Sequence, residues 1–425
     1  MLDKIKKISI FIGLLLLTVV TTTLAGAEHQ NYFSWNKLDG NPYDYYMTWD
    51  WFVYGFYYSV PFLLFLTCHE FGHYFMARYH KLKSSLPYYL PFWLPAMGIP
   101  MIGTFGAVIR LKSLTKTKRQ FFDVGIAGPI AGFVVAVIFL VIGFLTLPPA
   151  EKITEVHPEY AQLIEEYGED YHSHLKAHYE EETAREREYY TRGGRDSLLA
   201  TGQYSDLPDE YPGHSVAFFG TNLLYEGLAY LLVDDKTAAP QGFEIMHYPF
   251  LFAGLLSLLF TALNLIPVGQ LDGGHILYGL LGYDKFRKVS PYIFLVFLFY
   301  AGLGLDFGFI AFGEGASALL LSMVFYVLGL YFLLIKVFFS KKKVILIALG
   351  LVCAQLLLKA GFPDIKGYSS WLFYLFLLSR MIGVFHPPSI DETVPLDRKR
   401  KIWGVVALVI FVLCFTPYPL EILEF

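Results

Sequence analysis

The residues most suited to carry out chemistry are two histidines and a glutamate in an apolar run. They are His69, Glu70 and His73, in the sequence HEFGH. Histidines four positions apart lie on one face of a helix, one turn apart. Both imidazoles can then reach one divalent metal ion, with the glutamate beside a metal-bound water. Zn²⁺ lowers the pKa of its water from about 15.7 to about 7, and Glu70 could accept the proton and pass it to a leaving amine. The spacing therefore predicts hydrolytic metal chemistry.

A chance occurrence is the alternative, because the same pattern is found on helices of soluble proteins, where it forms only a polar face. In this chain the pattern lies near the end of an apolar run over residues 51–77. Ionisable side chains inside a membrane span are costly and normally functional. We therefore interpret His69 and His73 as metal ligands and Glu70 as a catalytic residue.

Two histidines leave a metal incomplete, because a catalytic zinc site has three protein ligands and one open position. The candidate third ligand is Asp272, within the sequence NLIPVGQLDGGH that starts at Asn264. Two glycines follow it and permit a close approach of the backbone. The alternative role for Asp272 is to cap a short helix expected over residues 275–281.

The depth of the candidate ligands in the membrane favours the metal site. The two histidines lie about twenty residues into their run, and Asp272 lies more than twenty residues beyond Tyr248, where a later run begins. If both runs start outside, and the span over residues 120–147 returns the chain between them, all three ligands come near the cytoplasmic end.

Composition restricts the class of protein. The chain has 425 residues, of which 55% are hydrophobic and 16% are charged, and its mean hydropathy is +0.46. Soluble domains carry roughly 25% charged residues, so a membrane protein is expected. A net charge of −4 without a basic binding module argues against a nucleic-acid partner. Cys68, Cys353 and Cys414 each lie in an apolar run and are expected to serve packing rather than disulfide bonds.

The predicted fold is an all-α polytopic membrane protein with about nine transmembrane helices, a re-entrant membrane hairpin and one extracytoplasmic insert. The expected spans are residues 8–25, 51–77, 120–147, 248–267, 290–304, 318–339, 344–358, 371–385 and 402–420. The first run also fits a signal peptide, but its length favours a retained span. The chain divides into a first helix with an outer loop (1–50), a first part of the catalytic core (51–148), the insert (149–247), a second part of the core (248–289) and C-terminal helices (290–425).

Basic residues orient these spans, because cytoplasmic loops collect Lys and Arg. With the N-terminus inside, the basic clusters all fall on one side; they occupy residues 78–83, 110–119, 285–288, 341–343 and 398–401. The metal site then lies near the cytoplasmic side. No transit peptide is evident, so the expected location is a bacterial cytoplasmic membrane.

Three segments do not fit regular spans. Residues 88–107 are apolar but interrupted by prolines and glycines, so a hairpin that enters and leaves on the cytoplasmic side is expected. Residues 216–232 carry polar residues among apolar ones and are expected at the outer interface. Residues 149–214 form an acidic insert outside the membrane, which could filter substrates or act as a spacer.

On these residues the chain resembles the site-2 protease family of intramembrane metalloproteases. Two motifs carry the resemblance, HEFGH at residues 69–73 and NLIPVGQLDGG at residues 264–274. The sequence DVGIAGP at residues 123–129 is similar to the family's AGP element, and residues 103–106 are similar to its glycine-containing hairpin. The resemblance covers residues 51–281 and is closest to the plastid and related bacterial branch, although no PDZ pattern is found.

The resemblance implies one Zn²⁺ per chain, bound by His69, His73 and Asp272, with Glu70 as general base and acid. It implies that Asn264 holds the scissile peptide or its developing oxyanion, and that the hairpin pairs with the substrate as an added strand. The expected substrate is a transmembrane protein in the lipid bilayer, already cut outside by another protease. The residues expected to contact it are Gly103, Thr104, Phe105, Gly106, Asn264 and Pro267.

Three other functions are considered. A metal transporter would share broken helices and buried polar residues, but it would spread them along a path rather than at one depth. A metalloprotease that cuts at the membrane surface would take a glutamate as third ligand. A catalytically inactive scaffold is disfavoured, because every residue that the mechanism needs is present.

His386, which precedes two prolines, is expected in a loop rather than as a further ligand.

Overall fold

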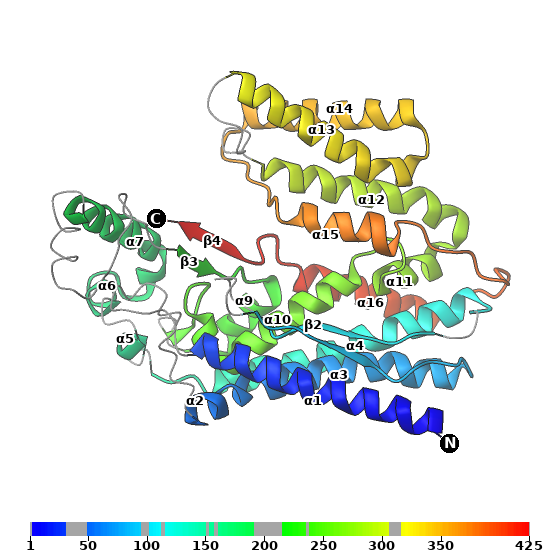
Figure 1. The fold of residues 1–425 in the computed structure, drawn as a ribbon, viewed down its shortest axis with the longest axis horizontal. Helices are drawn as coiled ribbons and strands as arrows, with labels where there is room; N and C mark the ends of the chain where they lie inside the picture. Colours follow the sequence, from blue (N-terminus) through cyan, green and yellow to red (C-terminus); the bar gives the residue numbers. More distant parts are fainter. Residues whose placement is uncertain are drawn as a thin grey trace.

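The computed structural model describes residues 2–30, 49–94, 102–111, 115–149, 153–156, 160–190, 215–234, 238–305 and 316–424. Helices dominate these residues, and two short two-stranded sheets accompany them. Figure 1 shows two groups of helices side by side, with the insert projecting from one end.

The first group surrounds the predicted ligands. It contains α1 (Leu2–Gln30), α2 (Trp49–Tyr54), α3 (Phe56–Tyr79), α4 (Lys118–Leu145), α10 (Pro249–Leu265), α11 (Asp272–Leu281) and α16 (Arg398–Cys414). Helix α4 packs against α3, α10 and α11, and α1 packs along α3. A hydrogen bond of 2.7 Å between the hydroxyls of Thr22 and Ser59 joins α1 to α3 inside the apolar interior.

The start of α4 is set by a capping box, in which Thr117 accepts from the backbone N–H of Gln120. The Gln120 side chain accepts in turn from the backbone N–H of Thr117. This cap sets the residue at which α4 begins. Glycines further along α4 allow it to approach α3 closely.

The predicted membrane hairpin is a β-hairpin. Strand β1 (Tyr88–Pro91) pairs antiparallel with β2 (Thr104–Val108), and the intervening residues 95–101 lie outside the described part. The hydroxyl of Tyr89 lies 2.7 Å from that of Thr67, so the hairpin is joined to α3 two residues before His69. The hairpin also contacts α1, which covers its other side.

The insert is helical, and its tip is only partly described. It contains α5 (Ile153–Val156), α6 (Tyr160–Tyr167), the 3-10 turn η4 (Gly168–Asp170) and α7 (Tyr171–Tyr189). Gly168, at φ +57°, begins η4 and separates α6 from α7. Strand β3 (Ser215–Phe218) pairs with the C-terminal strand β4 (Glu421–Glu424), which ties the insert to the end of the chain.

Helix α9 (Leu223–Leu232) follows β3 and lies beside α4 and α16. It has 10 residues. At 1.5 Å per residue it measures about 15 Å, roughly half of a bilayer's hydrocarbon core. The helical part of the segment 216–232 is therefore too short to cross a membrane alone, and the interfacial location of this segment stays a prediction.

The second group of helices follows α11. It contains α12 (Tyr283–Leu303), α13 (Ala316–Phe338), α14 (Lys341–Gly361), α15 (Trp371–Leu377) and the π-helix η8 (Leu378–Ile382), packed around a second apolar core. Buried Gln355 links three of these helices: it accepts from Tyr326 and donates to the Phe299 carbonyl. The guanidinium of Arg380 lies 3.5 Å from the centre of the Phe332 ring.

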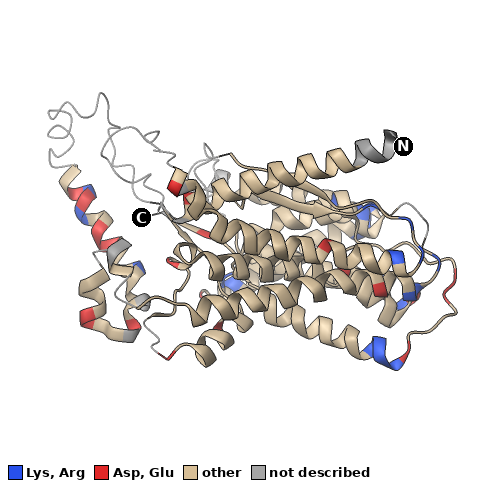
Figure 2. Cartoon of the chain, turned by 90° about the horizontal axis from the view of Figure 1, so that it is seen from below, with Lys and Arg blue, Asp and Glu red and all other residues tan. Residues whose placement is uncertain are grey.

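Six described helices are long and apolar enough to cross a membrane. They are Ile8–His29, Phe52–Tyr79, Lys118–Leu145, Tyr283–Leu303, Leu319–Phe338 and Lys341–Gly361. The other three expected spans correspond to shorter helices, α10, α15 with η8, and α16. The structure thus supports a polytopic membrane protein, whereas the count of nine is not confirmed. Figure 2 shows Lys and Arg gathered at the end of the bundle where the N-terminus lies, and many acidic residues at the opposite end.

An acidic residue is buried where the insert joins α10. Glu244, just before the 3-10 turn η7 (Ile245–His247), is 1% exposed. It lies beside an aromatic cluster that includes Tyr160 and Tyr171. Burial raises the pKa of Glu244 to about 8.

This burial predicts that the insert loses stability in alkaline solution. Because the folded-state pKa lies above the unfolded value, the stabilising contribution of the protonated carboxyl is complete below about pH 4 and is lost as the pH rises through about 8. Glu244→Gln should remove this loss, so that the variant melts above the wild type at pH 9. Scanning fluorimetry at pH 5, 7 and 9 measures it, with exposed Glu180→Gln as the control. Equal pH profiles for the wild type and Glu244→Gln would contradict the prediction.

Candidate metal centre

Three side chains from two helices bring their donor atoms together. Helix α3 carries His69 and His73 one turn apart, and Asp272 is the first residue of α11. The Nε2 atom of His73 lies 3.1 Å from His69 Nε2 and 3.1 Å from Asp272 Oδ2, and the His69 Nε2 to Asp272 Oδ2 distance is 3.5 Å. Among the described residues, this is the one group of three or more His, Cys, Asp or Glu side chains close enough to hold a metal ion.

These separations fit a tetrahedral metal. Ligands at about 2.0–2.1 Å from a tetrahedral Zn²⁺ lie about 3.3 Å from one another, which falls within the observed range. Two imidazole nitrogens and one carboxylate oxygen are also a donor set that zinc uses when a fourth position stays open. Both histidines are buried, at 3% and 7% exposure. The residues present therefore fit one divalent ion, and Zn²⁺ in particular.

A backbone carbonyl of α4 orients the ring of His73. The Nδ1 atom of His73 lies 2.7 Å from the Val124 carbonyl oxygen and therefore carries the hydrogen, which leaves Nε2 free for a metal. Histidine ligands commonly donate their second N–H to a backbone carbonyl in this way. The Nδ1 atom of His69 is buried and has no hydrogen-bond partner in the described part of the chain.

Glycines on α4 make room for the site. A Cβ atom at Gly128 would lie 2.1 Å from His73 Nε2, and one at Gly125 would lie 2.6 Å from the Cβ of His275 on α11. Gly132 is in similar contact with Phe65 and His69 on α3. The AGP element predicted from the sequence therefore has a steric role: it lets α4 approach both ligand-bearing helices.

The side chain of Asp272 does not cap α11. The helix has Leu271 as its N-cap, without a side-chain hydrogen bond. The Asp272 carboxylate points instead at the two histidines. The following glycines allow this, because a Cβ atom at Gly273 would lie 2.0 Å from the Leu265 carbonyl oxygen and one at Gly274 would lie 2.3 Å from the Gly269 carbonyl oxygen.

Glu70, a residue of α3, is buried beside the hairpin, at 6% exposure. Its carboxylate interacts with the backbone N–H of Ile109, just after β2, and lies close enough to His73 and Asp272 to interact electrostatically with both. The candidate general base is thus beside the metal donors without being one of them. The hairpin contributes part of its surroundings.

Asn264 and Pro267 shape the end of α10. The Asn264 amide donates to the Phe260 carbonyl oxygen at 3.0 Å. Pro267 has no N–H to pair with the Leu263 carbonyl four residues earlier. The hydroxyl of Tyr374, on α15, donates to that carbonyl at 3.0 Å. The sequence did not identify Tyr374, because nothing in its own neighbourhood marks it as the partner of a distant orphaned carbonyl.

Of the predicted substrate-binding residues, Gly103 directly precedes β2, and residues 104–106 begin the strand. Gly103 and Gly106 have φ angles of +86° and +101°, which side-chain-bearing residues rarely adopt. Thr104 donates to the Leu90 carbonyl at 2.8 Å and accepts from the Gly106 N–H, while Phe105 is 65% exposed. These residues therefore build a specific turn, and their contact with a substrate stays a prediction.

Asp123 forms an ion cluster that sequence reasoning missed. Its carboxylate accepts from Arg400 of α16 at 2.6 and 2.8 Å and lies 2.8 Å from His80 Nε2, just after α3. Asp123 directly precedes Val124, the carbonyl partner of His73. A carboxylate in an apolar span signals a functional or structural pair, but the partner Arg400 could not be read from the sequence.

Other histidines that the structure describes lie outside the group of metal donors. His174 stacks on Tyr167, and His178 lies 3.9 Å from Glu182, within the insert. His157 and the side chain of His172 lie outside the described residues. His386 is in a loop, as expected, but it is buried and lies 2.7 Å from His275.

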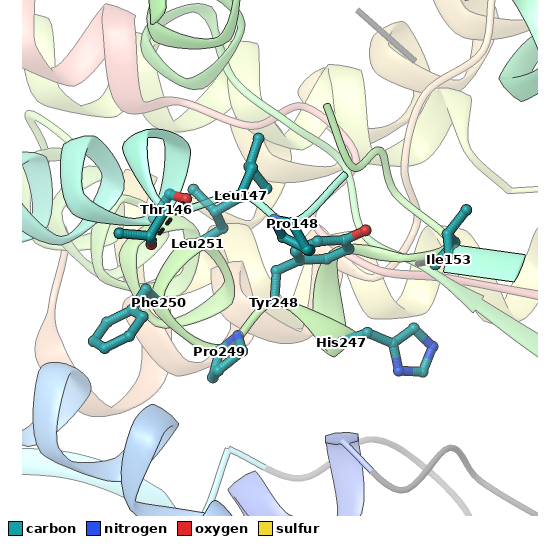
Figure 3. A pocket seen from close by; sticks show the side chains of 10 residues that line it. Thr146, Leu147, Pro148, Ile153, His247, Tyr248, Pro249, Phe250 and Leu251 are labelled. Carbon is teal, nitrogen blue, oxygen red and sulfur yellow. Dashed lines mark hydrogen bonds between the residues drawn. The ribbon is translucent and has the colours of Figure 1, made fainter. Parts of the chain in front are cut away.

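A cavity of about 230 Å³ lies far from this chemistry. It is lined by Leu147 and Pro148 beyond the end of α4 and by Tyr248 and Pro249 at the start of α10 (Figure 3). It lies at the start of α10, a helix of 17 residues whose other end leads to the loop before Asp272. At 1.5 Å per residue this helix is about 25 Å long. Its location therefore distinguishes it from the metal centre.

The close approach at Gly128 predicts the effect of one methyl group. Gly128→Ala places a Cβ atom against His73 Nε2 and should lower metal affinity by at least tenfold. Metal content after equilibrium dialysis measures this change. Gly350→Ala on α14 is the matched control, since its Cβ would meet nothing within 4 Å. Normal metal content in Gly128→Ala would mean that α4 can retreat from α3.

The bond from Tyr374 predicts a stability effect across the two helix groups. Tyr374→Phe leaves the Leu263 carbonyl without its hydroxyl donor and should destabilise the protein by about 1–3 kcal/mol. Thermal unfolding in detergent measures the loss. Tyr292→Phe, at a tyrosine that is 66% exposed, is the control. Equal melting of both variants would show that the carbonyl finds another donor.

Comparison with curated proteins identifies relatives that are named as probable zinc metalloproteases. The chain is 26% identical over 244 residues to "Probable zinc metalloprotease EGY2, chloroplastic" of Oryza sativa subsp. indica, which covers 57% of this chain and 32% of the relative. It is 25% identical over 356 residues to the protein of the same name from Arabidopsis thaliana, covering 84% and 40%. It is 26% identical over 239 residues to "Probable zinc metalloprotease EGY1, chloroplastic" of Arabidopsis thaliana, covering 54% and 31%.

The chain spans about a third of the length of the first of these relatives. No solved structure gives a significant match. The model of Peptidase family M50 matches residues 57–301, which include α3, α4, α10 and α11 and more than half of the chain. The protein therefore belongs to Peptidase family M50.

Proposed function

We propose that this protein is an intramembrane zinc metalloprotease of the site-2 type, which hydrolyses a peptide bond in or near a transmembrane segment of another membrane protein. The observation that carries the proposal is the convergence of His69, His73 and Asp272 next to Glu70 among apolar helices. Membership of Peptidase family M50 and the zinc metalloprotease names of the relatives support it.

In this proposal His69, His73 and Asp272 bind one Zn²⁺ through Nε2, Nε2 and a carboxylate oxygen. The ion, when bound, supplies Lewis acidity to a water and to the scissile carbonyl. Glu70 takes a proton from the attacking water and delivers it to the departing amide nitrogen, so that one C–N bond breaks as one C–O bond forms. Val124 holds the protonated Nδ1 of His73 and keeps its Nε2 turned toward the ion.

Substrate contacts are proposed for the hairpin and the end of α10. A substrate strand would add to the hairpin edge near Gly103, Thr104, Phe105 and Gly106, which would satisfy the backbone of an unwound helix in a dry environment. Asn264 would hold the peptide or its developing oxyanion, and Pro267 would keep the end of α10 open beside it. Glu70 would be reached from the same side, since it interacts with the backbone after β2.

The membrane arrangement is part of the proposal. Nine crossings, with the N-terminus inside, put the basic end of the bundle and the metal centre toward the cytoplasm, in line with the charge difference in Figure 2. The insert then lies outside and would meet substrates first, after another protease has trimmed them. A bacterial cytoplasmic membrane is our proposed location; the relatives named above are chloroplastic, and what the chain shares with them is the family core.

A transporter or an inactive scaffold is the competing function. Each could bind zinc at the same three residues, but neither would use Glu70 chemically. The polar groups gathered at one depth favour hydrolysis over a conduction path.

The test compares Glu70→Gln and Asp272→Ala with the wild type in detergent. Glu70→Gln should keep about one Zn²⁺ per chain and lose about 10²- to 10⁴-fold of cleavage of a model transmembrane substrate. Asp272→Ala should lose both zinc and cleavage. Glu226→Gln, an exposed glutamate on α9, is the matched control and should keep both.

Two results would reject the proposal. Cleavage at the wild-type rate by Glu70→Gln would remove the acid–base role. A wild type without zinc under metal-replete conditions would remove the ligand triad and favour a scaffold. Removal of zinc with a chelator should abolish cleavage, and readdition should restore it, which separates metal loss from unfolding.

A further inference from the structure

A loop from the end of the chain lies against the ligand-bearing helix α11. We call residues 382–393, which start at the last residue of η8 and lead toward α16, the C-terminal strap. The strap lies outside the segment 57–301 that matches Peptidase family M50. It nevertheless contacts both α11 and the loop before Asp272.

The first part of the strap is joined to the loop 266–271. Gln270 Nε2 donates to the Ile382 carbonyl oxygen at 3.1 Å. The Ser290 hydroxyl donates to the Val384 carbonyl at 2.8 Å and accepts from the Gly269 N–H at 3.3 Å. The loop that leads to Asp272 is therefore hydrogen-bonded to a segment more than a hundred residues away in sequence.

The last part of the strap is joined to α11 and to the start of α4. The Ser389 N–H donates to the Tyr278 hydroxyl at 2.8 Å, and the same hydroxyl donates to the Glu392 carboxylate. The Asp391 N–H donates to the Lys116 carbonyl at 2.8 Å, next to the N-cap of α4. The strap therefore connects α11, which carries Asp272, to the start of α4, which packs against both ligand-bearing helices.

His386 is the central contact of the strap. It is 3% exposed, its ring stacks on Tyr278 at 4.1 Å, and its Nε2 lies 2.7 Å from His275 Nδ1. Its own Nδ1 lies 2.5 Å from the Pro387 carbonyl oxygen, so Nδ1 must carry the hydrogen. His386 Nε2 is then the acceptor, and His275 Nδ1 is the donor.

His275 stands between the strap and α4. It follows Asp272 by three residues, so the two side chains lie on the same face of α11. A Cβ atom added at Gly125 would collide with the Cβ of His275. The His275 ring also stacks on Phe121, with the ring centres 5.4 Å apart. Rotation of α11 that moved Asp272 would have to move His275 away from both neighbours.

We propose that His386 is a positioning residue for the metal centre: by accepting the His275 Nδ1–H, it fixes the rotation of α11 and thereby the direction of the Asp272 carboxylate. The inference rests on the proposed function, because it treats Asp272 as a ligand. It extends the functional unit beyond residues 57–301, to a residue that touches neither metal donors nor substrate.

The test separates the hydrogen bond from the shape of the ring. His386→Phe keeps a ring that can stack on Tyr278 but has no acceptor, whereas His386→Gln offers an amide oxygen in its place. Ile390→Ala, at an exposed strap position, is the matched control. Purified full-length variants are loaded with Co²⁺, and their visible absorption spectrum and their metal affinity against a competing chelator are measured, followed by cleavage.

His386→Phe should shift the Co²⁺ spectrum and weaken metal binding about 10- to 100-fold. His386→Gln and Ile390→Ala should match the wild type. The reciprocal His275→Phe should give the same loss, and the double variant should lose no more than either single variant, because both remove one hydrogen bond. The reciprocal variant also serves if His386→Phe does not fold.

An unchanged Co²⁺ spectrum and affinity in His386→Phe or His275→Phe would overturn the inference. Equal losses in His386→Gln would also overturn it, since they would indicate general packing. These readouts do not depend on cleavage: a wild type that binds Co²⁺ but does not cleave would reject the proposed protease alone, and normal cleavage with an unaffected His386→Phe would reject the positioning role alone.

Discussion

The structure depends on one constraint: three polar donor atoms from α3 and α11 must meet within 3.1–3.5 Å inside a bundle of apolar helices. Unpaired, such groups would be costly to bury. A bound divalent ion would compensate for that burial, and the surrounding helices are arranged to permit it. Gly128 lets α4 approach His73, and the Val124 carbonyl then accepts the second N–H of that histidine.

A second requirement follows from the first. To turn the Asp272 carboxylate toward α3, the chain must leave α10, make a sharp turn and enter α11 within a few residues. This turn leaves backbone groups without helical partners in an apolar environment. Side chains from distant segments satisfy them: Tyr374 pairs with the Leu263 carbonyl, and Ser290 pairs with the Gly269 N–H. The C-terminal helices are thus part of the support of the site.

The ion cluster at Asp123 connects these features to the last helix. Arg400 of α16 reaches the carboxylate with two nitrogens, and His80 reaches it from the end of α3. Three helices therefore meet at the buried Asp123 carboxylate beside the Val124 carbonyl. Removing Arg400 would take the cationic partner away from this buried carboxylate, which is costly. The cluster limits how far α4 can move relative to His73.

Much of the site could be predicted from the sequence, because its chemistry is local. The spacing of His69, Glu70 and His73 follows from helix periodicity, and the glycines after Asp272 already indicate a close turn. The long apolar runs of the sequence indicated a bundle of membrane helices. The number of membrane crossings could not be predicted in the same way, because the length of a short apolar helix such as α10 does not show whether it crosses the membrane. The tertiary structure alone decided which distant groups complete the site: Tyr374, Arg400 and His386 have ordinary neighbours in sequence and acquire their roles only when folding brings them to an orphaned carbonyl, a buried carboxylate and a histidine of α11.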